Sequence, residues 1–392
     1  MTLGWQQVPI ATMRCDRAWV EINLAALAHN IRQLKHLLSL RTQLMAVVKA
    51  DAYGHGAVTV AETVLQAGAT WLGVATVPEG IELREAGITA PILILGATHT
   101  LEQIKAIAHW QLQPTLCNFK QALVFAEALT AMQSEVLPVH IKLDTGMSRL
   151  GPPWQQAVEF VQLIARLPNL KIASIYSHLA TAESPDQTIL RQQQQNFEQA
   201  IAQIKHSKLP LFQDEQTQPA LHLANSAATL TASDLHYDMV RVGLAMYGLY
   251  PACHLSPIDL KPVMQVKARI AQVKTIPTGT GVSYGHKFIS DRPIQLAVVG
   301  IGYADGVPRN LSNQMTVLVR GQRVPQIGAI TMDQLMLDVS AIADVQEGEV
   351  VTLLGEDGTE KISADDWATQ LNTISWEILC SFKHRLPRIA IP

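Results

Sequence analysis

Alternation of short apolar segments with amphipathic ones is the feature that most limits how this chain can fold. From residue 18 to about residue 250, segments of strand length are followed by segments of helical periodicity, about eight times in succession. The strand-like segments read AWVEINL, LMAVVKA, WLGVAT, PILILG, QPTLC, VHIKLDT, IASIYSH, LHLANS and MVRVGLAMYG. Helices that connect parallel strands pack outside the sheet, so this order predicts a (β/α)8 barrel of the TIM type, with an open doubly wound sheet as the alternative.

Three of the intervening segments carry clear helix signals. LAALAHNIRQLKHLL and AVTVAETVLQAG place apolar residues on one helical face, and Gly68 closes the second of them, as expected of a helix C-terminus. Four consecutive glutamines, 192–195, lie inside a third segment, TILRQQQQNFEQAIAQIK. We expect these glutamines on the solvated face of a helix.

The sequence changes character at PACHLSPIDLKPV, residues 251–263, which is rich in turn-forming residues. The segments beyond it, such as VMQVKARIAQVKTI and MTVLVRGQRV, are rich in β-formers separated by glycine-containing turns. We therefore expect a barrel over residues 14–250 and a mostly β-strand domain over residues 251–392, with residues 1–13 packed with the second domain.

Composition restricts the class of protein. The 392 residues are 48% hydrophobic and 16% charged, with a net charge of −3, which argues for compact folded domains and against nucleic-acid binding. The four cysteines are far apart, so neither a zinc site nor a disulfide framework is indicated, and we expect no metal and a reducing cytoplasm. No segment reads as an export signal or as a membrane span.

One lysine stands where a strand ends and a polar loop begins. In AVVKADAYGHG the apolar run ends on Lys49, and Tyr53, Gly54, His55 and Gly56 follow. Partial burial at the mouth of a sheet lowers the pKa of an ammonium group, and the free amine can then bond covalently to an aldehyde cofactor. The alternative is an ordinary lysine at a strand end that reaches solvent.

Four further segments also end a strand in polar residues, at the face where barrel enzymes keep their sites: IKLDTGMSRLG, IYSHLATAE, LHLANSAATL and MVRVGLAMYGLYP. Arg149 follows a turn and could present its guanidinium to an anion, or it could be a surface arginine. The pairs Asn225 with Ser226 and Gly243 with Leu244 could offer donors to a phosphate, or they could be a helix cap and a packing glycine.

Taken in order, these segments resemble those of alanine racemase, the pyridoxal-phosphate enzyme built from a barrel and a β domain. The resemblance covers nearly the whole chain and is most specific in VVKADAYGHG, KLDTGMSRLG, MVRVGLAMYGLYP, GVSYGHKF, IGYADG and ITMDQLMLD. It implies interconversion of L-alanine and D-alanine, which supplies D-alanine for peptidoglycan. The alternatives are a related racemase of broader specificity that includes serine, a decarboxylase of the same two-domain type, and a noncatalytic pyridoxal-phosphate carrier.

The resemblance also implies a shared active site. Lys49 would hold pyridoxal phosphate covalently and act as the base on one face of the substrate, and Tyr284, from the partner subunit of a homodimer, would act on the other. Racemisation removes a proton from one face of Cα and returns one to the opposite face, which a single fixed base cannot do without large movement. His178 and Arg241 would support the tyrosine or the cofactor, with Arg241 opposite the pyridine nitrogen.

The remaining roles are implied position by position. Tyr53, Asn225, Ser226, Gly243 and Leu244 would bind the cofactor, largely at its phosphate. Arg149 and Met332 would meet the substrate carboxylate or a cofactor oxygen, with Asp333 flanking them. Lys142 matches a lysine that many family members carry in carbamylated form, where it orients the arginine that is Arg149 here. His384 is a departure, because it occupies the position of a phosphate-binding tyrosine.

Overall fold

The structure is a computed structural model that describes residues 17–207, 209–212, 218–252, 254–255 and 258–392. The chain divides into two compact units. The barrel unit consists of Ala25–Ala52 and Ala57–Lys261. Of the described residues, the β unit consists of residues 17–24, Tyr53–Gly56 and Pro262–Pro392. Residues 1–13, which we expected to pack with the β domain, lie outside the described residues.

The barrel unit contains the predicted (β/α)8 architecture. Eight parallel strands pair in the order β8-β7-β6-β5-β4-β3-β2-β9. Backbone hydrogen bonds from Asp238 N to Leu221 O and from Arg241 N to Ala224 O, each 3.0 Å, join the two ends of the sheet. These bonds bring the barrel close to closure and exclude the open doubly wound sheet. The strands are β2 (Gln43–Val47), β3 (Trp71–Val74), β4 (Ile92–Ile94), β5 (Gln113–Leu116), β6 (Leu137–Lys142), β7 (Leu170–Tyr176), β8 (Ala220–His222) and β9 (Met239–Val242).

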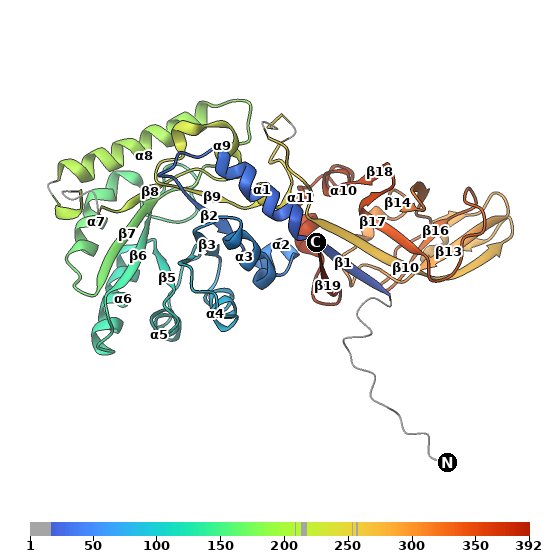
Figure 1. The fold of residues 1–392 in the computed structure, drawn as a ribbon, viewed down its shortest axis with the longest axis horizontal. Helices are drawn as coiled ribbons and strands as arrows, with labels where there is room; N and C mark the ends of the chain where they lie inside the picture. The colour runs from blue at the N-terminus through green and yellow to red at the C-terminus, as the bar shows by residue number, and fades with distance from the viewer. Residues whose placement is uncertain (1–16, 208, 213–217, 253, 256–257) are drawn as a thin grey trace, which may run out of the picture. The chain divides into compact units, whose positions relative to one another are not determined.

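Helices surround these strands (Figure 1). The three segments with helix signals all form helices, and α3 is followed by Gly68 at a φ of +112°. The prediction for the glutamines is wrong at one position, because Gln193 is only 1% exposed and its Nε2 donates to the carbonyl oxygen of His178 at 3.0 Å. The helices are α1 (Leu24–His36), α2 (Lys49–Gly54), α3 (Ala57–Gln66), α4 (Val77–Glu85), α5 (Leu101–His109), α6 (Phe119–Ala131), α7 (Ala157–Ala165), α8 (Thr188–His206) and α9 (Ser226–Thr231).

The β unit is built on a nine-stranded sheet. Its main path runs β15-β14-β17-β10-β1-β19, while β13 pairs with β10 and β16, and β18 pairs with β17. The strands are β1 (Ala18–Asn23), β10 (Met264–Ile276), β13 (Ile294–Val299), β14 (Thr316–Val319), β15 (Gln322–Pro325), β16 (Leu335–Asp338), β17 (Val350–Asp357), β18 (Glu360–Ile362) and β19 (Arg388–Ile391). A two-stranded sheet of β11 (Gly281–Val282) and β12 (Phe288–Ile289) and the helices α10 (Ala364–Leu371) and α11 (Ser375–Ser381) complete this unit.

One predicted barrel strand belongs to the β unit instead. The segment AWVEINL does form a strand, β1, but it pairs antiparallel with β10 and parallel with β19. The apolar pattern of a strand is local, whereas its partners here lie more than 240 residues away in the sequence, from Met264 to Ala268 and from Arg388 to Ile391. The barrel is therefore built from the other eight predicted strands.

Three further observations bear on the expected classes of site. None of the described helices has the length and apolar character needed to cross a membrane. In the described part of the chain, no group of three or more His, Cys, Asp or Glu side chains is arranged to hold a metal ion. Cys117 is buried and Cys380 is partly buried.

Candidate active site

The interior of the barrel is polar on several neighbouring strands. Side chains on alternate residues of a strand point to the same face, which in a barrel is either the interior or the helical layer. His140 and Lys142 share one face of β6, and Ser174 and Tyr176 share one face of β7. All four are buried. Branched aliphatic side chains normally fill this space, so the polar set indicates a functional interior.

Arg241, on β9, is the central charge of this interior. It is 4% exposed, and its guanidinium donates to the carbonyl oxygens of Ser177 at 2.7 Å and Leu223 at 3.2 Å. It also donates to Nδ1 of His222 at 3.0 Å and lies 3.3 Å from Nδ1 of His178. Burial lowers the pKa of Arg241 to about 10. Among the described residues, no carboxylate forms an ion pair with this guanidinium, so its charge is stabilised by neutral acceptors.

A chain of buried hydrogen bonds continues from His222 through the barrel. Nε2 of His222 lies 2.7 Å from Oγ of Ser174, which lies 2.6 Å from Nδ1 of His140, and Nε2 of His140 lies 2.8 Å from Oε1 of Gln113. An arginine can only donate, so Nδ1 of His222 accepts and its Nε2 carries the proton. Each following group then donates to the next, ending at the Gln113 oxygen. Burial lowers the pKa of His140 to about 3 and holds the pKa of His222 well below its usual range, so both imidazoles are neutral.

The ring of Tyr176 lies beneath two basic side chains, those of Lys142 and Arg241. Nζ of Lys142 lies 4.3 Å and the guanidinium carbon of Arg241 lies 5.1 Å from the centre of its ring. Its hydroxyl lies 2.7 Å from Oγ1 of Thr115, and burial raises its pKa to about 12. Burial, followed by repulsion from Arg241 and Arg149, holds the pKa of Lys142 well below its usual range. Lys142 is therefore a buried amine poised to be neutral.

Basic side chains gather around His178, just beyond the end of β7. Burial is the largest cause of its lowered pKa, followed by the positive charges of Arg241, Lys142, Arg149 and Lys49. The structure therefore places the four basic residues identified in the sequence within electrostatic reach of one imidazole. Such a cluster suits a ligand with several negative charges.

Lys49 begins a left-handed helical turn. Four residues that are not glycine follow it in the left-handed region, with φ values of 52–55°, at Ala50, Asp51, Ala52 and Tyr53. The left-handed conformation costs about 1–2 kcal/mol per residue, so the surrounding contacts must hold this turn in place. Lys49 itself is partly buried, as a reactive amine at a barrel mouth would be.

The loop that carries Arg149 is held by Asp144, whose Oδ1 accepts from the backbone nitrogens of Gly146, Met147 and Ser148 at 2.9–3.1 Å. The predicted turn at this place is confirmed. Arg149 is exposed, so its guanidinium is available to solvent or to a ligand.

The ends of β8 and β9 meet at Ser226. Its Oγ accepts from the backbone nitrogens of Gly243 at 3.0 Å and Ala245 at 3.4 Å. The hydroxyl hydrogen of Ser226 is thereby left to donate to another group. Oδ1 of Asn225 accepts from Ala228 N at 3.1 Å, so Asn225 acts as the N-terminal cap of α9. Leu244 begins the 3₁₀ turn Leu244–Tyr247.

The other predicted site residues belong to the β unit. Tyr284 is 72% exposed and begins the 3₁₀ turn Tyr284–His286, whereas Tyr53 is buried, and burial raises the pKa of its phenol. Met332, Asp333 and His384 are exposed. Nη2 of Arg385 donates to Oδ1 of Asp333 at 2.7 Å.

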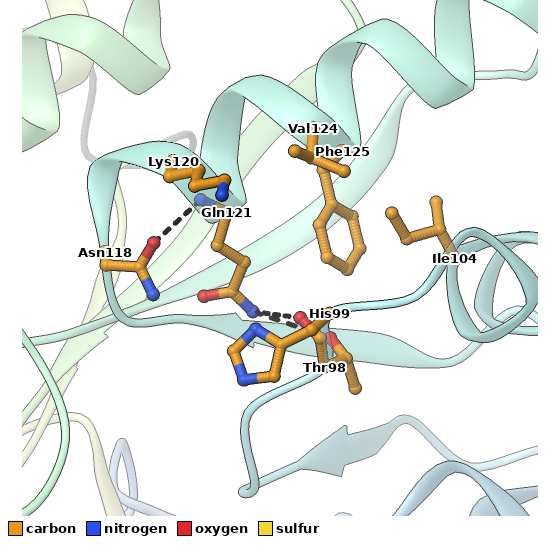
Figure 2. A pocket seen from close by; sticks show the side chains of 8 residues that line it. All are labelled: Thr98, His99, Ile104, Asn118, Lys120, Gln121, Val124 and Phe125. Carbon is orange, nitrogen blue, oxygen red and sulfur yellow. Dashed lines mark hydrogen bonds between the residues drawn. The ribbon is translucent and has the colours of Figure 1, made fainter.

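A separate cavity of about 300 Å³ lies beside α5 and α6, and it shares no lining residue with the cluster around His178. Figure 2 shows Gln121 at its centre, with Nε2 donating to the carbonyl oxygen of Thr98 at 3.0 Å. The same nitrogen also donates to the Thr115 carbonyl at 2.9 Å, so its hydrogens already have protein partners. The strand-end cluster is therefore the stronger candidate site.

Five residues of this site were missed by reading motifs at strand ends. Four of them lie within strands, two to four residues before the predicted positions Lys142, His178 and Asn225, and Gln193 lies on a helix. The four strand residues are His140, Ser174, Tyr176 and His222. The alternation HIK, SIY and HL, with polar and apolar residues in turn, is the signal that could have found the strand residues.

Comparison with known proteins agrees with this geometry. The family model of the alanine racemase N-terminal domain matches residues 22–251, and that of the C-terminal domain matches residues 263–390. An alanine racemase of Nostoc sp. is 71% identical over 378 residues, which is 96% of each chain.

Solved structures are also similar. Alanine racemase from Bacillus anthracis, determined with bound L-Ala-P, is 35% identical with a TM-score of 0.89, over 96% of this chain and 95% of that one. Alanine racemase from Bartonella henselae, determined with covalently bound pyridoxal phosphate, is 32% identical with a TM-score of 0.84, over 96% of this chain and 99% of that one. Both the sequence and the fold therefore show that the chain belongs to the alanine racemase family, whose members are isomerases that act on amino acids.

Proposed function

We propose that this chain interconverts L-alanine and D-alanine with pyridoxal phosphate held at the carboxyl ends of the barrel strands. The observation that carries the proposal is the buried Arg241 guanidinium, which neutral groups stabilise, beside the basic cluster of Lys49, Lys142 and Arg149 around His178. A phosphorylated aldehyde cofactor and a carboxylate substrate together supply the negative charge that this cluster would attract.

The donor set fits the cofactor. Lys49 would form the covalent bond, the Ser226 hydroxyl hydrogen and the Leu244 N–H would face the phosphate, and Arg241 would donate to the ring nitrogen. Gly243 would support this corner by donating its N–H to Oγ of Ser226. Tyr53 is the further phosphate contact that we propose, with Asn225 supporting this corner as a helix cap. When bound, the cofactor supplies an electron sink that makes the Cα proton of the amino acid removable.

Two groups would then move the proton. The Lys49 amine would take it from one face of Cα, and the partner subunit's Tyr284 would supply one to the other face, in a homodimer with shared sites. The 72% exposure of Tyr284 in the single chain supports this arrangement. Met332 and Asp333, also exposed, would border the substrate with Arg149, which would meet its carboxylate.

Arg241 would donate to the ring nitrogen without surrendering a proton. A guanidinium binds its protons tightly, and even with its pKa lowered to about 10 by burial it remains charged at neutral pH. Arg241 would thereby leave the ring nitrogen unprotonated, and the cofactor would supply a weaker electron sink than one paired with a carboxylate, which would disfavour side reactions such as transamination.

Lys142 has the environment that carbamylation requires. Only a neutral amine attacks carbon dioxide, forming a carbamate N–C bond and releasing a proton. The pKa of Lys142 is lowered by burial, and Arg149 and Arg241 lie close enough to contribute to that shift. A carbamate would replace repulsion with attraction and orient Arg149.

We further propose that the product supplies peptidoglycan synthesis in the cytoplasm and that His384 contacts phosphate in place of a tyrosine.

Racemisation of L-alanine by the purified protein, followed by chiral chromatography, tests the proposal. The sample is also reduced with borohydride, digested and analysed by mass spectrometry. D-alanine together with a pyridoxyl group on Lys49 is expected. A labelled Lys49 without D-alanine would favour serine or another substrate, and an unlabelled Lys49 would refute the cofactor assignment. Tyr284→Phe should keep the label and lose racemisation, whereas Tyr237→Phe, whose hydroxyl donates to Glu198 rather than to a proposed site group, is the matched control.

A further inference from the structure

The backbone next to Lys49 is held by a carboxylate from another loop. Oε1 of Glu79 accepts from the backbone nitrogen of Ala50 at 2.8 Å. Glu79 lies in the first turn of α4, directly after β3, whereas Ala50 follows the end of the neighbouring strand β2. A single side chain thus joins the segments that follow two adjacent barrel strands, β2 and β3, and Lys49 lies in the segment after β2.

The other oxygen of Glu79 is also used. Oε2 accepts from the backbone nitrogens of Ala75 at 2.7 Å and Thr76 at 3.0 Å, which fixes the loop before α4. Glu79 is partly buried, and its two carboxylate oxygens together accept three backbone bonds. Charge-assisted bonds of this kind are stronger than bonds between neutral groups.

The bond to Ala50 acts where the chain most needs support. Ala50 is the first of the four residues in the left-handed region. Two further bonds hold the same turn, from Ala57 N to Oδ1 of Asp51 at 2.8 Å and from Ala52 N to the Val48 carbonyl oxygen at 2.9 Å. Of these three bonds, only that of Glu79 ties the turn to a different strand of the barrel.

We propose that Glu79 is a positioning residue for the amine of Lys49. By holding the N–H of the next residue, it fixes the peptide that follows Lys49 and hence the direction in which the Lys49 side chain leaves the barrel strand. A small misplacement of a reacting group lowers rates strongly. The inference rests on the proposed function, in which Lys49 bonds the cofactor and moves the proton.

The alternative is that Glu79 acts only as a cap of α4, and Glu79→Gln separates the two roles. Glutamine keeps one acceptor oxygen. If that oxygen accepts from the backbone nitrogens of Ala75 and Thr76, the amide nitrogen faces the N–H of Ala50. Both of these groups are donors, so no hydrogen bond forms between them. The cap is therefore kept, and the bond to the Lys49 turn is lost.

Thr76→Val is the complementary variant, because it removes the capping hydroxyl of α4 and leaves Glu79 in place. Glu82→Gln, an exposed acid of the same helix, is the matched charge control.

Three quantities are measured on the full-length protein. Hydrogen exchange followed by mass spectrometry reports protection of the Ala50 amide in a peptide spanning residues 48–54. Mixing apoprotein with pyridoxal phosphate gives the rate of covalent bond formation at Lys49. Steady-state racemisation of L-alanine gives kcat and KM separately.

Glu79→Gln is expected to lose protection at Ala50, to bond pyridoxal phosphate about tenfold more slowly and to lower kcat about tenfold, with KM nearly unchanged. Thr76→Val and Glu82→Gln should match the native protein in all three. Native behaviour of Glu79→Gln, or equal losses in Thr76→Val, would overturn the inference. A native protein that bonds no pyridoxal phosphate at Lys49 would instead refute the proposed function. Hydrogen exchange at Ala50 needs no cofactor, so it tests the role of Glu79 separately from the proposed function.

Discussion

Acid should weaken the fold through the histidines buried in the barrel. His140 is 1% exposed, and burial lowers its pKa from 6.5 to about 3. Between these two values the unfolded chain binds a proton that the folded protein excludes. The free energy of unfolding therefore rises with pH across this window and falls as the pH drops below 6.5.

The magnitude follows from the two pKa values. Lowering the pH from 7 to 5 protonates this imidazole almost completely in the unfolded state and hardly at all in the folded state, a loss of about 2 kcal/mol of unfolding free energy. His222 is completely buried, and its lowered pKa adds a loss of the same sign. A typical domain is stable by only about 5–15 kcal/mol, so the effect is readily measured.

Urea unfolding of the apoprotein, followed by circular dichroism at pH 7, 6 and 5, provides the assay. His140→Asn is expected to be less stable than the native protein at pH 7, since Ser174 and Gln113 lose a partner. Because it lacks the excluded proton, the gap between variant and native protein should shrink by about 2 kcal/mol at pH 5. His99→Asn, at an exposed position, is the control. A gap that stays constant across the pH range would refute the reasoning.

Three further changes test the packing around the site. Gly151→Ala should lower the unfolding free energy, measured in urea, by more than about 2 kcal/mol. The new Cβ would lie 2.6 Å from the Lys142 carbonyl oxygen, at a φ of +105°. Gly87→Ala, at a φ of +86° with open space around the new Cβ, should lose clearly less unfolding free energy. His222→Phe keeps a ring stacked on Tyr176, but Arg241 loses an acceptor and Ser174 loses a donor. A loss of about 3 kcal/mol of unfolding free energy is expected in thermal unfolding, and a loss below about 1 kcal/mol would contradict the hydrogen-bond chain. Arg385→Ala breaks an exposed ion pair with Asp333 and a 3.5 Å pair with the buried Asp305, which keeps its closer pair with Arg17. The unfolding free energy should therefore change by no more than about 1 kcal/mol.

The barrel was predictable because its signals are local. Eight strands and the helices between them follow from apolar periodicity within single segments. The ninth strand-like segment, β1, has the same local pattern, and only its pairing with β10 and β19 places it in the β unit. Gln193 shows the same limit, since its three glutamine neighbours give no sign that this one faces inward to bond the His178 carbonyl.

The left-handed turn after Lys49 has no counterpart in the sequence pattern. Ala, Asp, Ala and Tyr all favour negative φ values, so local preference argues against the observed conformation. Contacts supply what local preference opposes, through Glu79 from the next loop and Asp51 toward α3. Conformations of this kind are found at functional sites, where the surroundings determine the backbone more strongly than its own sequence does.

The polar barrel interior is best understood as the environment of one charge. A buried guanidinium without a carboxylate needs acceptors, and His222 can accept at Nδ1 only if its other nitrogen donates. Oγ of Ser174 accepts the hydrogen bond from Nε2 of His222 and donates to Nδ1 of His140, and Nε2 of His140 then donates to Gln113. Replacing His222 by an acid would remove the requirement but would pair Arg241 with a negative charge and weaken the electrostatic pull on an anionic or electron-rich ligand. A neutral chain keeps the arginine positive toward the barrel mouth, and this arrangement requires three buried polar side chains, His222, Ser174 and His140, and the partly buried Gln113.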